Sequence, residues 1–116
     1  MRRVVEKIEE EMGKITGVLH GAGLNIPRPI FQVSLEEAME EISPKALGAI
    51  HLAEALKERD LKIFAGISSI IAITGMPGNA WYGFSNEAME IVLRRYGAEN
   101  PGTRILCVNF SVWKEE

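Results

Sequence analysis

The sequence is poor in the features that mark secreted, membrane-spanning and nucleic-acid-binding proteins. Its one cysteine, Cys107, cannot form an internal disulfide, and its place in an apolar run predicts a small buried hydrophobic residue. No apolar stretch reaches the roughly 18 residues that a membrane helix needs. The net charge of −3 gives no basic surface for nucleic acid. These absences predict a cytoplasmic protein with no nucleic-acid or membrane partner.

What the sequence does contain is typical of one small globular domain. Its 116 residues are 47% hydrophobic and 25% charged, a balance that favours a folded chain over a disordered one. Arg2 and Arg3 follow the first methionine, but the segment then turns acidic, so we expect no signal peptide. The two histidines, His20 and His51, have no acidic or cysteine residue at ligand spacing, so no metal site is predicted.

Apolar strands alternate with helices along the chain. Ser34 with Glu37 three residues later predicts a capping box, and Ser43 before Pro44 predicts a new N-cap and a fresh helix start. The expected elements are a helix at Val4–Met12, a strand at Ile15–His20, a helix from Ser34 that restarts at Ser43 and reaches Arg59, a strand at Leu61–Ile67, a turn-rich loop at Thr74–Gly78, a helix at Ala80–Tyr96 and a strand at Ile105–Phe110. This order predicts parallel βαβ units in a three-layer α/β arrangement, with no linker or repeat.

Polar side chains gather where the strands are predicted to end. Ser69 closes the second strand, and Tyr82 and Asn86 open the long helix one turn apart. Lys45 lies on the preceding helix. In open parallel sheets, chemistry takes place beyond the carboxyl ends of the strands. A tyrosine hydroxyl can give a proton to a carbonyl oxygen while a hydride reaches the carbon, a serine can hold that oxygen, and a cation makes the phenol more acidic. Each residue alone is commonplace, but the set favours carbonyl reduction.

In these segments the chain resembles the short-chain dehydrogenases/reductases, and among them the ketoreductase domains of modular polyketide synthases. The matching segments are Val18–Gly23 for V-x-H-x-A-G, Ser43–Lys45 for x-P-K, Phe64–Ile70 for F-x-x-x-S-S, Gly78–Tyr82 with Asn86 for G-Q-x-x-Y-x-x-x-N, and Val108–Trp113 for I-N-W-x-x-W. Other members of the superfamily carry lysine at the place of Asn86. The exchanged positions of Lys45 and Asn86 therefore favour the polyketide branch.

The resemblance implies roles for these residues and a set of partners. Tyr82 would donate the proton, Ser69 would bind the substrate carbonyl, and Lys45 and Asn86 would complete a catalytic tetrad. The cofactor would be NADPH. Its expected neighbours are Gly21, Ala22, Gly23, Phe110, Ser111 and Val112. The substrate would be a β-ketoacyl thioester on an acyl carrier protein, reduced to the β-hydroxyacyl thioester.

The resemblance also implies that residues 1–116 are a partial domain, the second half of a Rossmann-type ketoreductase. No counterpart of the family's first strand and glycine-rich turn, which hold the pyrophosphate, is found. The glycines of Gly75–Gly78 do not replace that turn, because no strand precedes them at the required spacing. Asn25–Arg28 and Thr74 stand where the family carries its stereochemical markers, and match neither class. The sequence therefore predicts neither product stereochemistry nor a particular acyl chain.

Three interpretations remain open at this stage: an inactive piece of a polyketide synthase, one chain of a split reductase, and a non-catalytic structural or interaction module. In a complete family fold the strand Ile15–His20 pairs with a strand of the other half. An apolar edge without that partner is a template for pairing with another chain. We therefore expect the chain to associate with the other half, with the rest of a synthase or with a second copy, and to bind NADPH very weakly alone.

Overall fold

Among the residues that the structure describes, three parallel strands form one sheet in the order β1-β2-β3. A computed structural model describes residues 1–112. The elements are α1 (Arg2–Met12), β1 (Gly17–His20), η1 (Ile30–Gln32), α2 (Leu35–Ile42), η2 (Ser43–Leu47), α3 (Gly48–Ala55), β2 (Ile63–Ser69), α4 (Ile71–Thr74), α5 (Ala80–Glu99) and β3 (Arg104–Phe110). This architecture confirms the predicted α/β class with a parallel sheet.

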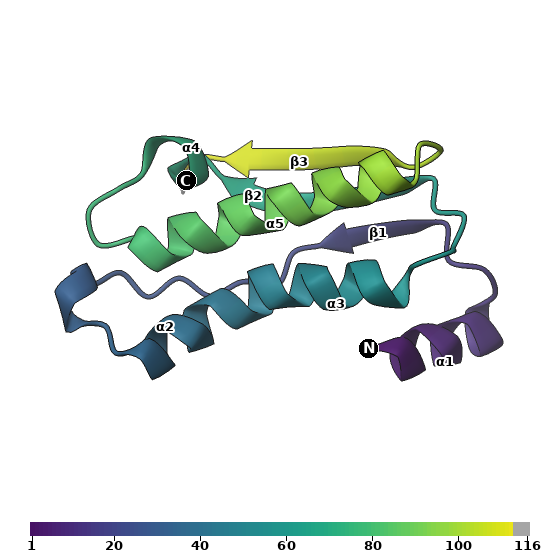
Figure 1. The fold of residues 1–116 in the computed structure, drawn as a ribbon, viewed down its shortest axis with the longest axis horizontal. Coiled ribbons are helices and arrows are strands. Elements are labelled where there is room, and N and C mark those ends of the chain that lie inside the picture. Colours follow the sequence, from purple (N-terminus) through teal and green to yellow (C-terminus); the bar gives the residue numbers. More distant parts are fainter. Residues whose placement is uncertain (113–116) are drawn as a thin grey trace, which may run out of the picture.

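The helices α3 and α5 lie side by side along one face of the sheet (Figure 1). The strands all run in the same direction, so their carboxyl ends meet at one side of the molecule, on the left in Figure 1. The loops that follow the strands, together with α2 and α4, gather at that side. The topology therefore brings together the segments that carry Ser69, Tyr82 and the residues after β3.

The core lies between the sheet and these helices. Phe64 of β2 is fully buried, and its ring meets Tyr96 of α5 edge to face, with ring centroids 5.2 Å apart. The Tyr96 hydroxyl donates to the Leu56 carbonyl at 3.0 Å, which satisfies its polar end. Gly66 has no side chain where α5 crosses β2, so Met89 can approach the strand backbone closely. This packing fixes the height of α5 above β2.

The predicted helix start at Ser43 is wrong. Ser43 has helical backbone angles, and its hydroxyl donates backward to the Met39 carbonyl at 2.5 Å instead of capping a new helix. The chain passes from α2 into α3 through the π-helical turn η2, which accommodates Pro44. Ile42, Ala46 and Ala49 are all buried, so one continuous apolar stripe runs across the junction. Burial of that stripe keeps the helix unbroken.

The predicted capping box is confirmed, and other boundaries shift by a few residues. Ser34 accepts a hydrogen bond from the Glu37 amide, and the Glu37 carboxylate accepts one from the Ser34 amide. β1 begins at Gly17, β2 covers Ile63–Ser69, α3 ends at Ala55, α5 extends to Glu99, and the short helix α4 was not predicted. Glu58 takes a left-handed conformation with φ 64°, which ends the turn after α3. Across residues 1–112, none of the helices combines the length and apolar character that crossing a bilayer requires.

Candidate active site

A cavity of about 430 Å³ opens at the carboxyl ends of β2 and β3. Its walls come from the end of β2, from α4 and the loop after it, from the first turn of α5, and from the residues that follow β3. Five of the predicted site residues line it: Ser69, Tyr82, Phe110, Ser111 and Val112. The lining of the cavity combines polar groups from separate elements with apolar side chains, which is the usual composition of a small-molecule site.

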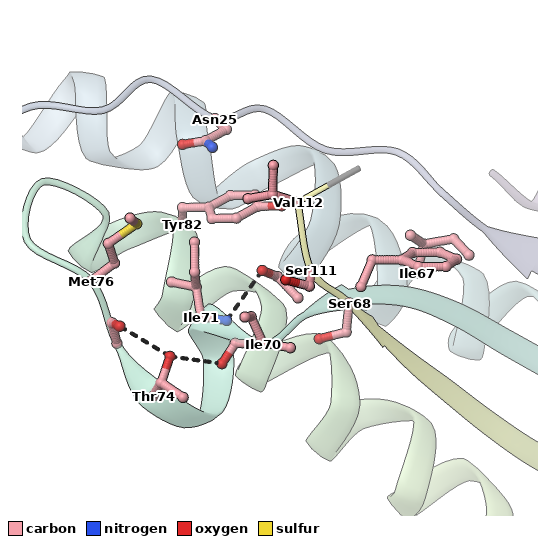
Figure 2. A pocket seen from close by; sticks show the side chains of 13 residues that line it. Asn25, Ile67, Ser68, Ile70, Ile71, Thr74, Met76, Tyr82, Ser111 and Val112 are labelled. Atoms are coloured by element: carbon pink, nitrogen blue, oxygen red, sulfur yellow. Dashed lines mark hydrogen bonds between the residues drawn. The ribbon is translucent and has the colours of Figure 1, made fainter. Parts of the chain in front are cut away.

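Ser69 and Tyr82 reach this cavity from two different elements. Ser69 is the last residue of β2, and its hydroxyl oxygen accepts a hydrogen bond from the Ile71 amide at 3.2 Å, drawn as a dashed line in Figure 2. Tyr82 lies in the first turn of α5, and Figure 2 shows its ring pointing into the space bordered by Asn25 and Val112. A carbonyl group in this space can therefore meet a hydroxyl from the sheet and a phenol from the helix.

Lys45 and Asn86 form a buried pair behind Tyr82. The Lys45 ammonium donates to the Asn86 side-chain oxygen at 3.1 Å and to the Ile67 carbonyl at 2.7 Å. The Asn86 amide group donates to the Tyr82 carbonyl at 2.8 Å, one helical turn back. Neither Lys45 nor Asn86 lines the cavity. The pair therefore connects the helix turn that bears Tyr82 to the strand that bears Ser69.

Lys45 lies in the π-helical turn η2 and is held by its backbone as well as by its side chain. His20, at the end of β1, donates from Nε2 to the Lys45 carbonyl at 2.9 Å. Lys45 is thus held by its backbone to β1 and by its side chain to β2 and α5. Burial lowers the pKa of Lys45 from its usual value of 10.5, because desolvation disfavours the charged form.

The loop of Gly21, Ala22 and Gly23 runs from β1 toward this pair and does not line the cavity. A Cβ on Gly23 would lie 2.9 Å from Cε of Lys45, so the absence of a side chain at Gly23 leaves room for the lysine. A Cβ on Gly21 would approach only the Ile67 side chain, at 3.8 Å. The structure therefore places this loop beside the end of β2.

The cavity also has wall residues to which the sequence reasoning gave no role, although it noted Asn25 and Thr74 as departures from the family's stereochemical markers. Asn25 forms part of its wall, although it belongs to a loop without regular structure. That loop is held by Arg28, whose amide donates to the Gly78 carbonyl at 2.8 Å and whose guanidinium pairs with Glu37 of α2. The pairing of two loops leaves no periodic signal in the sequence. Trp113, which the motif after β3 includes, lies outside the described residues.

Solved structures with the same fold define the class of this protein. A ketoreductase from the macrolactin assembly line matches with a TM-score of 0.88 and 29% identity over 97% of this chain. A ketoreductase domain from the bacillaene assembly line matches with a TM-score of 0.86 and 30% identity over 98% of this chain. The Rossmann-type fold is thus that of the short-chain dehydrogenases/reductases.

The family follows from the sequence comparison. The KR domain family matches residues 1–115, so this chain belongs to the KR family, the ketoreductase domains of polyketide synthases. Polyketide synthase PksM of Bacillus subtilis is 32% identical over 111 residues. A phenolphthiocerol/phthiocerol polyketide synthase subunit of Mycobacterium tuberculosis is 26% identical over 113 residues. The resemblance to polyketide synthase ketoreductase domains, inferred from the sequence motifs, is confirmed.

The matches cover almost all of this chain and a small share of the relatives. The chain spans 3% of PksM and 6% of the mycobacterial subunit. It spans 23% and 28% of the macrolactin and bacillaene ketoreductase chains.

Proposed function

We propose that this chain supplies the catalytic residues of a ketoreductase that reduces a β-ketoacyl thioester, carried by an acyl carrier protein, to a β-hydroxyacyl thioester. The observation that supports this most directly is the arrangement at the end of β2. Ser69 and Tyr82 line one cavity, and the Lys45–Asn86 pair ties their two elements together. A carbonyl reductase needs a hydrogen-bond donor and a proton donor on one oxygen, and this site offers both.

In this proposal the Ser69 hydroxyl donates to the substrate carbonyl oxygen, and the Tyr82 phenol gives that oxygen its proton. The Tyr82 ring already points into the cavity (Figure 2), so its phenol can reach a carbonyl bound there. Asn86 holds the helix turn below Tyr82, and Lys45 holds Asn86. The acyl carrier protein, as the carrier of the thioester, would approach the open side of the cavity.

The last residue of β3 and the two residues that follow it fit a nicotinamide cofactor. Phe110, Ser111 and Val112 border the same cavity as Ser69 and Tyr82, so these three residues would hold the nicotinamide end of the cofactor near the proposed carbonyl site. The Gly21 loop, which approaches β2 without side-chain bulk, would lie beside the rest of the cofactor. NADPH, when bound, would supply the hydride to the β-carbon.

We further propose that the chain works inside a longer ketoreductase domain, in the cytoplasm. Two observations support the first part. The chain spans under a third of the solved ketoreductase chains, and one face of its sheet carries exposed apolar side chains. The single cysteine supports the second part, because it is typical of a reducing compartment.

The test is turnover of the full-length protein that contains this chain, with NADPH and a soluble β-ketoacyl thioester. Tyr82→Phe removes only the phenolic oxygen. We expect it to lower kcat by about 10²–10⁴-fold, because a positioned proton donor usually accelerates a reaction by that factor. Tyr96→Phe, on the same helix, is the matched control. It removes the hydroxyl that bonds the Leu56 carbonyl, so it should lower stability and leave kcat unchanged. Wild-type kcat in Tyr82→Phe would contradict the proposed role.

A further inference from the structure

A largely buried polar cluster borders the cavity through Ser68 and has no part in the tetrad. It consists of Ser68, Glu90 and Asn109, and we call it the Glu90 cluster. Ser68 and Glu90 are only 3% and 6% exposed. The Ser68 hydroxyl donates to Oε2 of Glu90 at 2.7 Å, and the Asn109 amide group lies 3.2 Å from the Ser68 hydroxyl oxygen and 3.3 Å from the same Glu90 oxygen.

The Glu90 cluster joins three elements at the place where the proposed chemistry occurs. Ser68 precedes Ser69 at the end of β2, Asn109 precedes Phe110 at the end of β3, and Glu90 lies on α5. The Asn109 amide group also donates to the Ser69 carbonyl at 3.1 Å. The Glu90 carboxylate on the helix therefore accepts hydrogen bonds from the ends of both strands, from Ser68 of β2 and from Asn109 of β3.

Glu90 shares a helix face with the proposed proton donor. Tyr82, Asn86 and Glu90 follow one another at intervals of four residues, so their side chains lie along one side of α5. The sheet end is thus bonded to this helix at two places. One runs from Asn86 through Lys45 to the Ile67 carbonyl, and the other runs from Glu90 to Ser68. Ser69 follows these two attachment points directly.

A carboxylate in this place needs a specific reason, because burial of a charge is costly unless the charge is paired and hydrogen-bonded. Glu90 meets that condition. Its Oε2 accepts hydrogen bonds from Ser68 and Asn109, and its Oε1 lies 3.5 Å from the Arg94 guanidinium. A fully satisfied polar cluster of this kind fixes one arrangement of its elements more sharply than apolar packing, which tolerates sliding. The neighbouring contacts of α5 with β2, such as Met89 against Gly66, are apolar and carry no such directional constraint.

We propose that Glu90 is a positioning residue. Through Ser68 and Asn109 it holds the ends of β2 and β3 against α5, and so sets the placement of the Ser69 hydroxyl relative to the Tyr82 phenol. The inference rests on the proposed function for its effect on turnover, but the geometric part does not depend on that function.

The first test measures turnover of the full-length protein carrying Glu90→Leu or Glu90→Gln. Leucine removes the acceptor, and we expect kcat to fall about tenfold or more with little change in KM for NADPH, because small misplacement of reacting groups is costly. Glutamine keeps a side-chain oxygen for Ser68 and Asn109, so we expect it to restore most of kcat. Glu87→Leu, at an exposed glutamate of the same helix, is the matched control and should retain wild-type kcat.

The second test does not require turnover. Amide hydrogen exchange reports the Ile70 amide, which bonds the Phe110 carbonyl at 3.0 Å, and the Ile71 amide, which bonds the Ser69 hydroxyl oxygen. Glu90→Leu should accelerate exchange at these two amides, and Glu90→Gln and Glu87→Leu should not. If the leucine variant does not fold, Ser68→Ala is measured in the same way, since it removes one hydroxyl from the same cluster.

The outcomes separate the two proposals. A wild-type protein with no reductase activity would end the proposed function, and the exchange data alone would then decide the role of Glu90. The positioning role of Glu90 is overturned if Glu90→Leu keeps wild-type kcat or leaves amide exchange at Ile70 and Ile71 unchanged. It is also overturned if Glu90→Gln lowers kcat as much as Glu90→Leu does.

Discussion

At the scale of single residues, Lys45 shows how one side chain can serve several elements at a cost. Its ammonium meets two uncharged acceptors, the Ile67 carbonyl and the Asn86 side-chain oxygen. These contacts replace some of the hydration that burial removes. Desolvation still dominates and lowers the pKa of Lys45. A lysine that is easier to deprotonate than usual makes the stability of the fold depend on pH.

The first prediction concerns that pH dependence. Because the pKa of Lys45 is lower in the folded chain than the usual 10.5, the unfolded chain binds more protons between these two values. The free energy of unfolding contributed by this group therefore rises with pH across that window. We expect Lys45→Met to lose this rise, so that the wild type gains stability over the variant as pH increases toward 10.5. Urea unfolding at a series of pH values measures the difference.

Lys57→Met is the control for the loss of one positive charge, because Lys57 is exposed beside Glu54. A change of pH slope in Lys57→Met as large as that in Lys45→Met would contradict this explanation.

At the scale of elements, the contact of α5 with β2 depends on the missing side chain of Gly66. A Cβ at this position would lie 2.9 Å from Cε of Met89 and 3.0 Å from Cδ2 of Leu93, and both residues are fully buried. The side chains of Met89 and Leu93 on the helix therefore occupy the space beside the Gly66 backbone. Interiors of this density respond to a single added methyl group.

The second prediction is that Gly66→Ala destabilises the chain by roughly 1–3 kcal/mol, the usual cost of overpacking a core. Met89 is flexible and can relieve part of the clash, which favours the lower end of that range. Gly102→Ala serves as the control, because a Cβ there meets nothing within 4 Å. The measurement is the free energy of unfolding in urea. Equal stabilities for the two variants would show that α5 can lift from β2 at no cost.

At the scale of the whole molecule, the two faces of the sheet are unequal. The helices cover the face that presents Phe64, and the other face carries Leu19, Ile63 and Leu106, which are 68%, 37% and 46% exposed. Among residues 1–112, β1 pairs with β2 alone, so its second edge is open. Leaving a few hundred Å² of apolar surface in water costs several kcal/mol, at about 25 cal/mol per Å². Association relieves that cost.

The third prediction follows from this open face and edge. The purified 116-residue chain should sediment as a species larger than a monomer, because copies can pair through β1 and cover the apolar face. Leu19→Lys places a charge on the edge strand and should shift the distribution toward monomer. Leu35→Lys changes an 80% exposed leucine of α2, away from the sheet, and should leave sedimentation unchanged. A wild-type chain that stays monomeric and melts in one sharp cooperative transition would refute the expectation.

The sequence by itself determined the order of the elements, the parallel sheet and the neighbourhood of Ser69 and Tyr82. Apolar strands separated by crossover helices leave few arrangements, and in a parallel sheet the strand ends meet at one side. The spacing of four residues also placed Tyr82 and Asn86 on one face of α5. The capping box at Ser34 was predictable because it is formed by residues three apart.

Only the tertiary structure decided which of several local options each polar residue took. Ser43 could cap a new helix or bond backward to Met39, and burial of the stripe through Ala46 selected the second. In the sequence, Glu90 is indistinguishable from the other charged residues of its helix. Only in the folded chain do β2 and β3 place Ser68 and Asn109 within hydrogen-bond distance of it. Contacts between residues far apart in the chain follow from how α5 packs on the sheet. Local periodicity cannot encode them, because the same helix pattern is compatible with many heights and rotations above the strands.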